Sequence, residues 1–248
     1  MTQQVEPGPH ARLGRAVGAD AGVAGVALVL PAGQVDSARG PSAVAYAAGR
    51  GLARELAGAG VSEGLRAHVV RYRGRGWNGA DARLAADAQW AVEEVVRRYG
   101  DVPVGLVGVG MGGRAALRAA GHPAVNSVVA WAPWLPGGSV DEEPVRQLVG
   151  RRVLIAHGTE DGWAAPDLSF RLAERVKKAN RDTCRFEVHS DGHGLRQHRA
   201  EVRALTVDFV LGSLFGRPYA RAVADALAAP PPLGLRMPLA SGFGTPRG

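Results

Sequence analysis

Short apolar runs alternate with longer amphipathic stretches along most of this chain. The apolar runs suit fully buried strands, and the amphipathic stretches have the spacing of helices with one apolar face. This alternation is typical of an α/β fold, in which helices cover both faces of a mostly parallel sheet. The predicted strands, roughly six in number, are residues 23–32, 67–72, 102–110, 127–133, 152–158 and 184–190. The predicted helices are residues 43–60, 81–100, 111–121, 166–180 and 199–216, with a short closing helix within 217–227.

The length of the chain allows one large domain. A chain of 248 residues can bury a sizeable core, and the alternation continues from residue 23 to residue 227. We therefore predict a single α/β domain over residues 23–227. Residues 1–22 are polar with Pro and Gly, so a flexible N-terminal segment is expected. Residues 228–248 lack periodicity, and a disordered or loosely docked Pro/Gly-rich tail is expected there.

Charge and composition narrow the classes of partner. The formal net charge is +7, but Lys177 and Lys178 are the only lysines, and the arginines are spread along the chain. No zinc-finger spacing or basic-aromatic cluster accompanies the charge, so no nucleic-acid partner is expected. No apolar run reaches the roughly 20 residues that span a bilayer, and residues 1–20 carry no secretory signal. A cytoplasmic protein with no membrane partner is therefore expected.

Cysteine usage excludes two further classes of site. Cys184 is the single cysteine, which rules out an intrachain disulfide and any metal site built from several cysteines. It lies in a predicted strand, where a buried and inert thiol is expected. We predict no metal and no cofactor.

Three short segments carry the residues that bear on catalysis. GVGMGG at 108–113 follows one predicted strand and opens a helix. HGTEDGWAAP contains Asp161, and VHSDGHGL contains His193. Each segment lies where a strand ends, at the edge of the sheet where ligands bind in this class of fold.

The first segment resembles the nucleophile elbow of α/β-hydrolases. In that superfamily the pattern G-x-S-x-G links a central strand to a helix and exposes the serine at the turn. GVGMGG is similar to the common form G-H-S-M-G-G, with Gly110 in the serine position and Val109 in that of the histidine. The resemblance implies an α/β-hydrolase fold and makes Gly110 a vacant nucleophile position.

The other two segments resemble the superfamily's acid and histidine loops. HGTEDGWAAP is similar to H-G-x-x-D-x-x-x-P, which matches Asp161 to the catalytic acid, although Pro166 comes one residue late. VHSDGHGL matches His193 to the catalytic histidine, and the order Gly110, Asp161, His193 is that of the superfamily. The resemblance covers about residues 23–215. No large cap domain fits between Gly110 and Asp161, so the compact esterase and dienelactone-hydrolase-like branch is the closer match.

Each of these residues also has an ordinary structural explanation. A glycine at a strand–helix junction is often only a turn residue, Asp161 suits the turn of TEDG, and a loop histidine is common. For each residue alone, the structural explanation is as good as the functional one. The occurrence of Gly110, Asp161 and His193 together, in the superfamily's order, favours function. We assign structural roles to His157, His189 and His198.

The resemblance implies a changed chemistry, because Gly110 has no hydroxyl group. In the family mechanism a serine attacks a carbonyl, the histidine takes its proton, and the acid orients the imidazole. No acyl-enzyme can form on Gly110, so ordinary serine-esterase turnover is not expected. The resemblance places the oxyanion hole at the backbone N–H of Met111 and in the loop after the first strand, at Gly33 or Gln34.

Three hypotheses follow from this arrangement. In the first, the Asp161–His193 pair is a general base that activates water or takes a substrate proton, as in superfamily members with non-hydrolytic chemistry. In the second, the protein is an inactive pseudohydrolase that binds a small molecule or a partner. In the third, a relocated nucleophile serves an active esterase, with Ser37, Ser139 and Thr159 as candidates. Retention of both Asp161 and His193 favours the first.

Tryptophans suggest the character of the ligand. Four of them lie near the carboxyl ends of predicted strands, where ligands bind in this class: Trp77, Trp131, Trp134 and Trp163. For each alone, core packing is as good an explanation. Together they predict a pocket for a small, apolar, carbonyl-type substrate or ligand.

Overall fold

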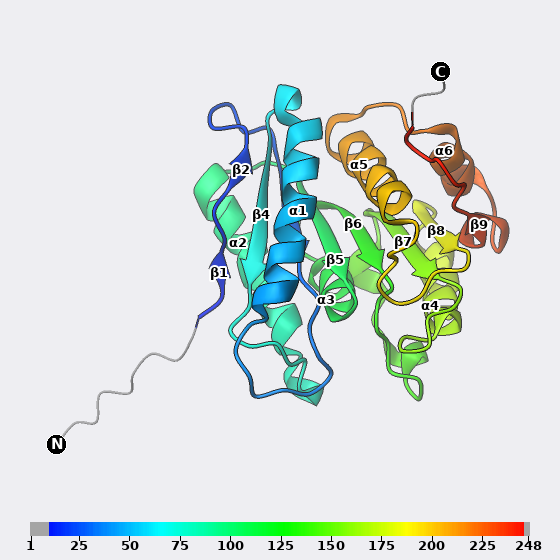
Figure 1. The fold of residues 1–248 in the computed structure, drawn as a ribbon. Helices are drawn as coiled ribbons and strands as arrows, with labels where there is room; N and C mark the ends of the chain where they lie inside the picture. The colour runs from blue at the N-terminus through cyan, green and yellow to red at the C-terminus, as the bar shows by residue number, and fades with distance from the viewer. Residues whose placement is uncertain (1–9, 246–248) are drawn as a thin grey trace.

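A nine-stranded sheet runs through the centre of the computed structural model, which describes residues 10–245 (Figure 1). The strands are β1 (Arg12–Leu13), β2 (Val17–Gly18), β3 (Gly25–Leu30), β4 (Leu65–Arg71), β5 (Val104–Val109), β6 (Val125–Trp131), β7 (Arg152–Gly158), β8 (Thr183–Val188) and β9 (Met237–Pro238). Their order is β1-β4-β3-β5-β6-β7-β8-β9, with β2 also paired to β4. Strands β3 to β9 are parallel to their neighbours, whereas β1 and β2 run antiparallel to β4.

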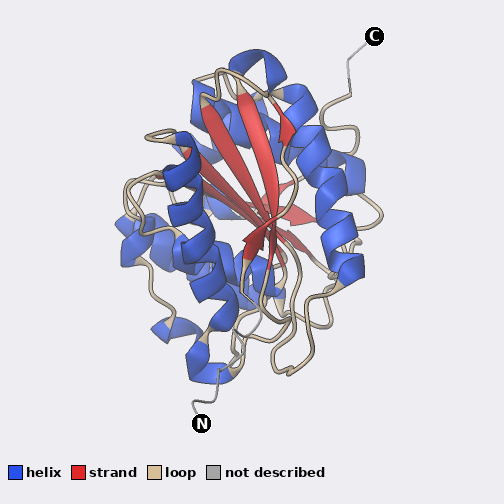
Figure 2. Cartoon of the chain, turned by 90° about the vertical axis from the view of Figure 1, so that its left-hand side faces the viewer, coloured by secondary structure: helices blue, strands red, loops and turns tan. Residues whose placement is uncertain are grey.

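Helices cover both faces of this sheet (Figure 2). On one face α1 (Ala43–Ala59), α5 (Arg199–Phe215) and α6 (Arg221–Ala228) pack in one hydrophobic cluster. On the other face α2 (Arg83–Tyr99), α3 (Met111–Ala119) and α4 (Pro166–Ala179) pack in a second cluster. None of the helices within residues 10–245 combines the length and the apolarity needed to cross a bilayer.

The α/β architecture predicted from the sequence is confirmed. The long strands β3 to β8 and all six helices lie within a few residues of their predicted ranges. The reason is visible in the burial: every residue of β3 is buried, and Leu84, Ala88, Val92 and Val95 form the buried face of α2. Because both faces of the central strands are covered, their sequences are continuously apolar rather than alternating.

The N-terminal segment differs from the flexible segment expected for residues 1–22. Residues 1–9 lie outside the described residues, but β1 and β2 both pair with β4. The backbone N–H of Gly14 donates to the carbonyl of Val69 at 2.8 Å, and Ala11 and Ala19 are buried. Edge pairing through the main chain orders this segment, and such pairing leaves little trace in a polar sequence.

The C-terminal segment also differs from the loosely docked tail expected for residues 228–248. β9 pairs with β8, and the backbone N–H of Leu239 donates to the carbonyl of Glu187 at 2.9 Å. Leu235 and Leu239 are buried. The buried Lys177 ammonium donates to the carbonyls at the end of α6, which fixes the start of the tail. The β9 pairing and the two buried leucines together dock this aperiodic segment; residues 246–248 are outside the described residues.

The Leu235→Ala variant is expected to lower the free energy of unfolding by about 2–3 kcal/mol, since Leu235 is 0% exposed. The matched control is Leu233→Ala, because Leu233 lies in the same turn but is 66% exposed. Its effect should stay within about 0.5 kcal/mol. Urea denaturation followed by circular dichroism measures both. Equal small effects would contradict a docked tail.

Candidate active site

Three loops at the carboxyl edge of the sheet bring the predicted residues together. Gly110 lies between β5 and α3, Asp161 lies in the loop after β7, and His193 lies in the loop between β8 and α5. These strands are parallel, so their carboxyl ends lie at the same edge of the sheet. Segments more than 80 residues apart in sequence therefore form one site.

Gly110 forms a sharp turn from strand to helix. Its backbone has φ 55° and ψ −118°, and α3 begins at the next residue, Met111. A positive φ costs a residue with a side chain roughly 1–3 kcal/mol, whereas glycine adopts it freely. A side chain at Gly112 would collide with the carbonyls of Leu30 and Pro31, so the helix packs closely on the end of β3 only because glycine is there.

His193 and Asp161 form a hydrogen-bonded pair. His193 Nδ1 lies 2.8 Å from Asp161 Oδ2. The Asp161 side chain is fully buried, while 30% of the His193 side chain is exposed. A carboxylate only accepts, so Nδ1 carries the proton, and in the neutral ring the lone pair is then on Nε2, which faces Gly110. This tautomer is the one that a general base requires.

Asp161 is held as a carboxylate by several donors. Its Oδ1 accepts the backbone N–H groups of Trp163 and Ala164, both at 2.9 Å, and Oδ2 also lies 3.2 Å from His157 Nε2. Burial raises the pKa of Asp161, but these hydrogen bonds and the one from His193 outweigh burial and hold it well below the ordinary value. The late Pro166 is the first residue of α4 and leaves this turn intact.

The space above Gly110 faces the imidazole of His193. A Cβ built on Gly110 would lie 3.2 Å from His193 Nε2 and 4.0 Å from the Cβ of Ala32, with 3.6 Å to His193 Cε1 as its other close contact. This contact is tight for a Cβ atom, so Nε2 of His193 lies directly against the turn at Gly110.

The three predicted oxyanion-hole residues, Met111, Gly33 and Gln34, differ in their surroundings. Met111 is the first residue of α3, and the first N–H groups of a helix have no partner within it. Gly33 packs against Met111, since a Cβ on Gly33 would lie 3.4 Å from the Met111 Cβ. Gln34 differs from the prediction, because its N–H donates to the carbonyl of Arg75 at 2.7 Å. A pairing between two loops has already used that donor.

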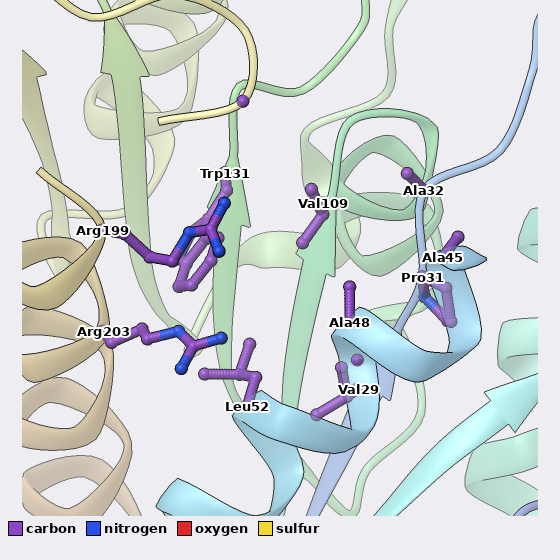
Figure 3. Close-up of a pocket in the computed structure, with 12 residues that line it drawn as sticks. Val29, Pro31, Ala32, Ala45, Ala48, Leu52, Val109, Trp131, Arg199 and Arg203 are labelled. Atoms are coloured by element: carbon purple, nitrogen blue, oxygen red, sulfur yellow. The ribbon is translucent and has the colours of Figure 1, made fainter. Parts of the chain in front are cut away.

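A cavity of about 190 Å³ lies beside this pair, between α1 and α5 (Figure 3). Gly194 and Val109, the neighbours of His193 and Gly110, line it. Arg199 and Arg203 extend from α5 toward the apolar side chains of α1. The apolar lining comes from Val29, Pro31, Ala32, Ala48, Leu52 and Trp131. The cavity therefore combines an apolar wall with two guanidinium groups.

Of the four tryptophans, three lie near the site. Trp131 lines the cavity, and its indole N–H donates to Thr206 Oγ1 at 2.9 Å. Trp163, 49% exposed, has its ring 4.4 Å from that of His193 in an edge contact, and Trp134 packs against Trp163 at 6.4 Å.

Trp77 is the exception and is not a pocket residue. It is buried in the cluster beneath α2 and α3, on the other face of the sheet from the cavity. The Arg114 guanidinium lies 4.1 Å above its ring. Its position after a predicted strand suggested the carboxyl edge of the sheet, but its side chain packs on the face that α2 and α3 cover.

The comparison with protein families agrees with this geometry. The model of the dienelactone hydrolase family matches residues 64–223, a segment that includes Gly110, Asp161 and His193. The chain belongs to the dienelactone hydrolase family. No curated protein matches its sequence significantly.

Solved structures place this family member in the α/β-hydrolase fold. A protein from Thermus thermophilus is 17% identical with a TM-score of 0.60, and the match covers 84% of this chain and 100% of that one. An α/β serine hydrolase without a lid, from Xanthomonas campestris, is 18% identical over 82% and 89% of the two chains, with a TM-score of 0.59. An esterase from Pyrococcus furiosus is 13% identical over 78% and 82%, with a TM-score of 0.58. These identities support the fold alone.

The candidates for a relocated nucleophile lie elsewhere in this dienelactone hydrolase family member. Ser37 Oγ accepts the N–H of Arg39 and lines a separate surface pocket. Thr159 Oγ1 accepts the N–H of Ser190, and Ser139 precedes the short helix Val140–Glu142. Within residues 10–245, no hydrogen bond joins any of the three to His193.

Two features of the site were missed from the sequence. His157 was assigned a structural role, yet it contacts Asp161 directly. Arg199 and Arg203 looked like part of a diffuse arginine bias, yet both line the cavity. Their spacing of four residues on one helix, directly after the His193 loop, is the signal that could have found them.

Proposed function

We propose that this protein is a dienelactone hydrolase family member in which Gly110 occupies the nucleophile position and the His193–Asp161 pair works as a general base. One observation carries the proposal: His193 Nε2 faces the turn at Gly110, 3.2 Å from the place where a Cβ on that residue would lie. In a serine hydrolase the nucleophile's hydroxyl extends from that Cβ. Because Gly110 has no side chain, a water molecule or the acidic group of a substrate takes the place of the hydroxyl in this proposal.

The chemistry proposed is proton transfer without a covalent step. His193 takes a proton through Nε2, and Asp161 Oδ2, at 2.8 Å from Nδ1, stabilises the imidazolium that forms. The backbone N–H of Met111, at the positive end of α3, stabilises negative charge that develops on a carbonyl oxygen. The same groups serve two reactions: hydrolysis by an activated water molecule, and formation of an enolate by loss of a substrate proton.

The cavity supports a small substrate. Its volume of about 190 Å³ and its apolar wall suit a compact carbonyl compound with an apolar body. Arg199 favours a substrate that also carries a negative charge, whereas Arg203 already pairs with Glu55 at 3.1 Å. Trp163 lies against the His193 ring in an edge contact, with 4.4 Å between the ring centroids, and adds an apolar surface beside the base.

The unmodified protein is expected to hydrolyse p-nitrophenyl acetate only at a weak background rate. Water replaces a positioned nucleophile in this reaction, so no acyl-enzyme accumulates and no burst of product is expected. Stopped-flow absorbance with and without a fluorophosphonate measures this. A high rate that the fluorophosphonate abolishes would overturn the proposal and favour a relocated nucleophile.

The His193→Ala variant separates a base from a binder. If His193 is the base, the remaining rate should fall to that of buffer, while the affinity for a small ligand of the cavity stays within about threefold. His189→Ala is the control, since His189 lies in the same loop but outside the pair. A rate that is unchanged in His193→Ala would leave only the pseudohydrolase hypothesis.

A further inference from the structure

His157 lies behind the catalytic pair and is fully buried at the end of β7. Its Nε2 is 3.2 Å from Asp161 Oδ2, the same oxygen that His193 contacts, and 2.9 Å from the carbonyl oxygen of Ala164. Its Nδ1 is 2.8 Å from Ser169 Oγ. Both ring nitrogens therefore have partners, and one of these partners belongs to the site.

The partners fix the direction of the hydrogen bonds. A carbonyl and a carboxylate only accept, so Nε2 of His157 carries the proton and donates to both. Nδ1 faces the hydroxyl oxygen of Ser169 at 2.8 Å, so the far side of the ring is held as well.

Arg185 completes this chain of hydrogen bonds. Its buried guanidinium donates through Nε to Ser169 Oγ at 3.0 Å, so the serine oxygen accepts from the arginine. The hydroxyl of Ser169 donates to the carbonyl of Pro166 at 2.8 Å, and Arg185 Nη2 donates to the same carbonyl at 3.2 Å. A carbonyl oxygen has two lone pairs and accepts both bonds. Arg185 and Pro166 therefore hold Ser169 Oγ in place against Nδ1 of His157, and the hydrogen-bonded network from Arg185 to Asp161 is continuous.

We propose that His157 is a positioning residue for His193: it donates to Asp161 Oδ2, holds the carboxylate in place and shares its negative charge, while Ser169 and Arg185 hold the far side of its ring. The inference rests on the proposed role of His193 as the base. Oδ2 thereby serves two imidazoles, so removal of His157 leaves that oxygen to His193 alone.

The first test uses the unmodified protein. Long-range ¹H–¹⁵N correlation spectra of histidine-labelled protein report which nitrogen of each ring is protonated. We expect a proton on Nε2 of His157, because both partners of that nitrogen only accept. An Nε2 without a proton would overturn the inferred donation to Asp161.

The second test is the titration of His193 by NMR in the His157→Phe variant without added ligand. This variant keeps an aromatic ring at residue 157 but loses the N–H group that donates to Asp161. We expect the midpoint of His193 to rise by about 0.5–1 pH unit, because Asp161 then serves His193 alone. The charged or titratable groups around this pair include Asp161 and His157, Arg185 behind Ser169, Asp191 in the His193 loop, and Arg199 and Arg203 across the cavity. An unchanged or lower midpoint in the folded variant would overturn the proposal.

Matched controls distinguish this effect from a general loss of a buried histidine. His68 is also buried with both ring nitrogens bonded, to Gly14 and Tyr99, so His68→Phe should leave the His193 midpoint unchanged. If His157→Phe does not fold, the His193 midpoint in Ser169→Ala is compared with that in Ser213→Ala, since Ser213 is another buried serine. Ser169→Ala should raise the midpoint by a smaller amount, and no rise would count against the proposal. These readings need no turnover, so they stand apart from the test of the proposed function.

Discussion

The Gly110→Ser variant is expected to hydrolyse p-nitrophenyl acetate on the order of 10²- to 10⁴-fold faster than the unmodified protein. The introduced Cβ would lie 3.2 Å from His193 Nε2, so a small shift of the His193 loop brings the hydroxyl within reach of the base. The backbone of Gly110 already has the positive φ of a strand-to-helix turn that presents a nucleophile. A burst of nitrophenol and labelling of residue 110 by a fluorophosphonate measure the gain.

Two controls accompany this variant. Gly110→Ala carries the same backbone strain, roughly 1–3 kcal/mol, but no hydroxyl, and should stay at the background rate. Adding His193→Ala to Gly110→Ser should remove both the burst and the labelling. A folded Gly110→Ser variant without labelling would mean that Gly110 is not the nucleophile position.

Asp161→Asn in the Gly110→Ser background is expected to reduce the rate on the order of 10³- to 10⁴-fold. The asparagine amide can donate to His193 Nδ1, which then loses its proton to Nε2, and the ring can no longer act as a base. Asp208→Asn is the matched control: Asp208 is half-buried on α5 and accepts the N–H of Ala220, away from the site. Steady-state kinetics across pH 5–9 compare the two.

The same substitution has a consequence for stability at acid pH. Asp161 has a folded-state pKa below the ordinary 3.8, so its contribution to stability is fully present above about pH 4 and is lost as the pH falls through the folded value. The Asp161→Asn variant lacks this contribution and should be less stable at neutral pH, with a smaller loss on acidification. An unchanged acid transition would show that the carboxylate contributes nothing to folding.

Local patterns were sufficient to predict the sheet and the positions of the three loops. Continuous apolar runs are specific to strands buried on both faces, and β3 and β5 have this burial. The order of Gly110, Asp161 and His193 adds a constraint that no single loop supplies. The hydrogen bond of 2.8 Å between His193 and Asp161 is the contact that this order predicts.

The remaining features depend on contacts between distant segments. The N–H of Gln34 donates to the carbonyl of Arg75, and the Arg114 guanidinium lies over the ring of Trp77. No pattern in the neighbouring sequence predicts either contact. β1, β2 and β9 are short edge strands whose order comes from main-chain pairing with β4 and β8. The positioning role proposed for His157 also has no local pattern, because it depends on the contact between its Nε2 and Asp161 Oδ2 in the folded chain.

The docking of the C-terminal segment has a consequence for biosynthesis. Arg185 Nη1 donates to the carbonyl of Leu235 at 3.0 Å, so the end of the chain binds the guanidinium whose Nε contacts Ser169. A nascent chain folds from its N-terminus while the ribosome adds residues. We expect the elbow and the sheet to form early, and the support behind Asp161 to be completed only after Leu235 has left the ribosomal exit tunnel.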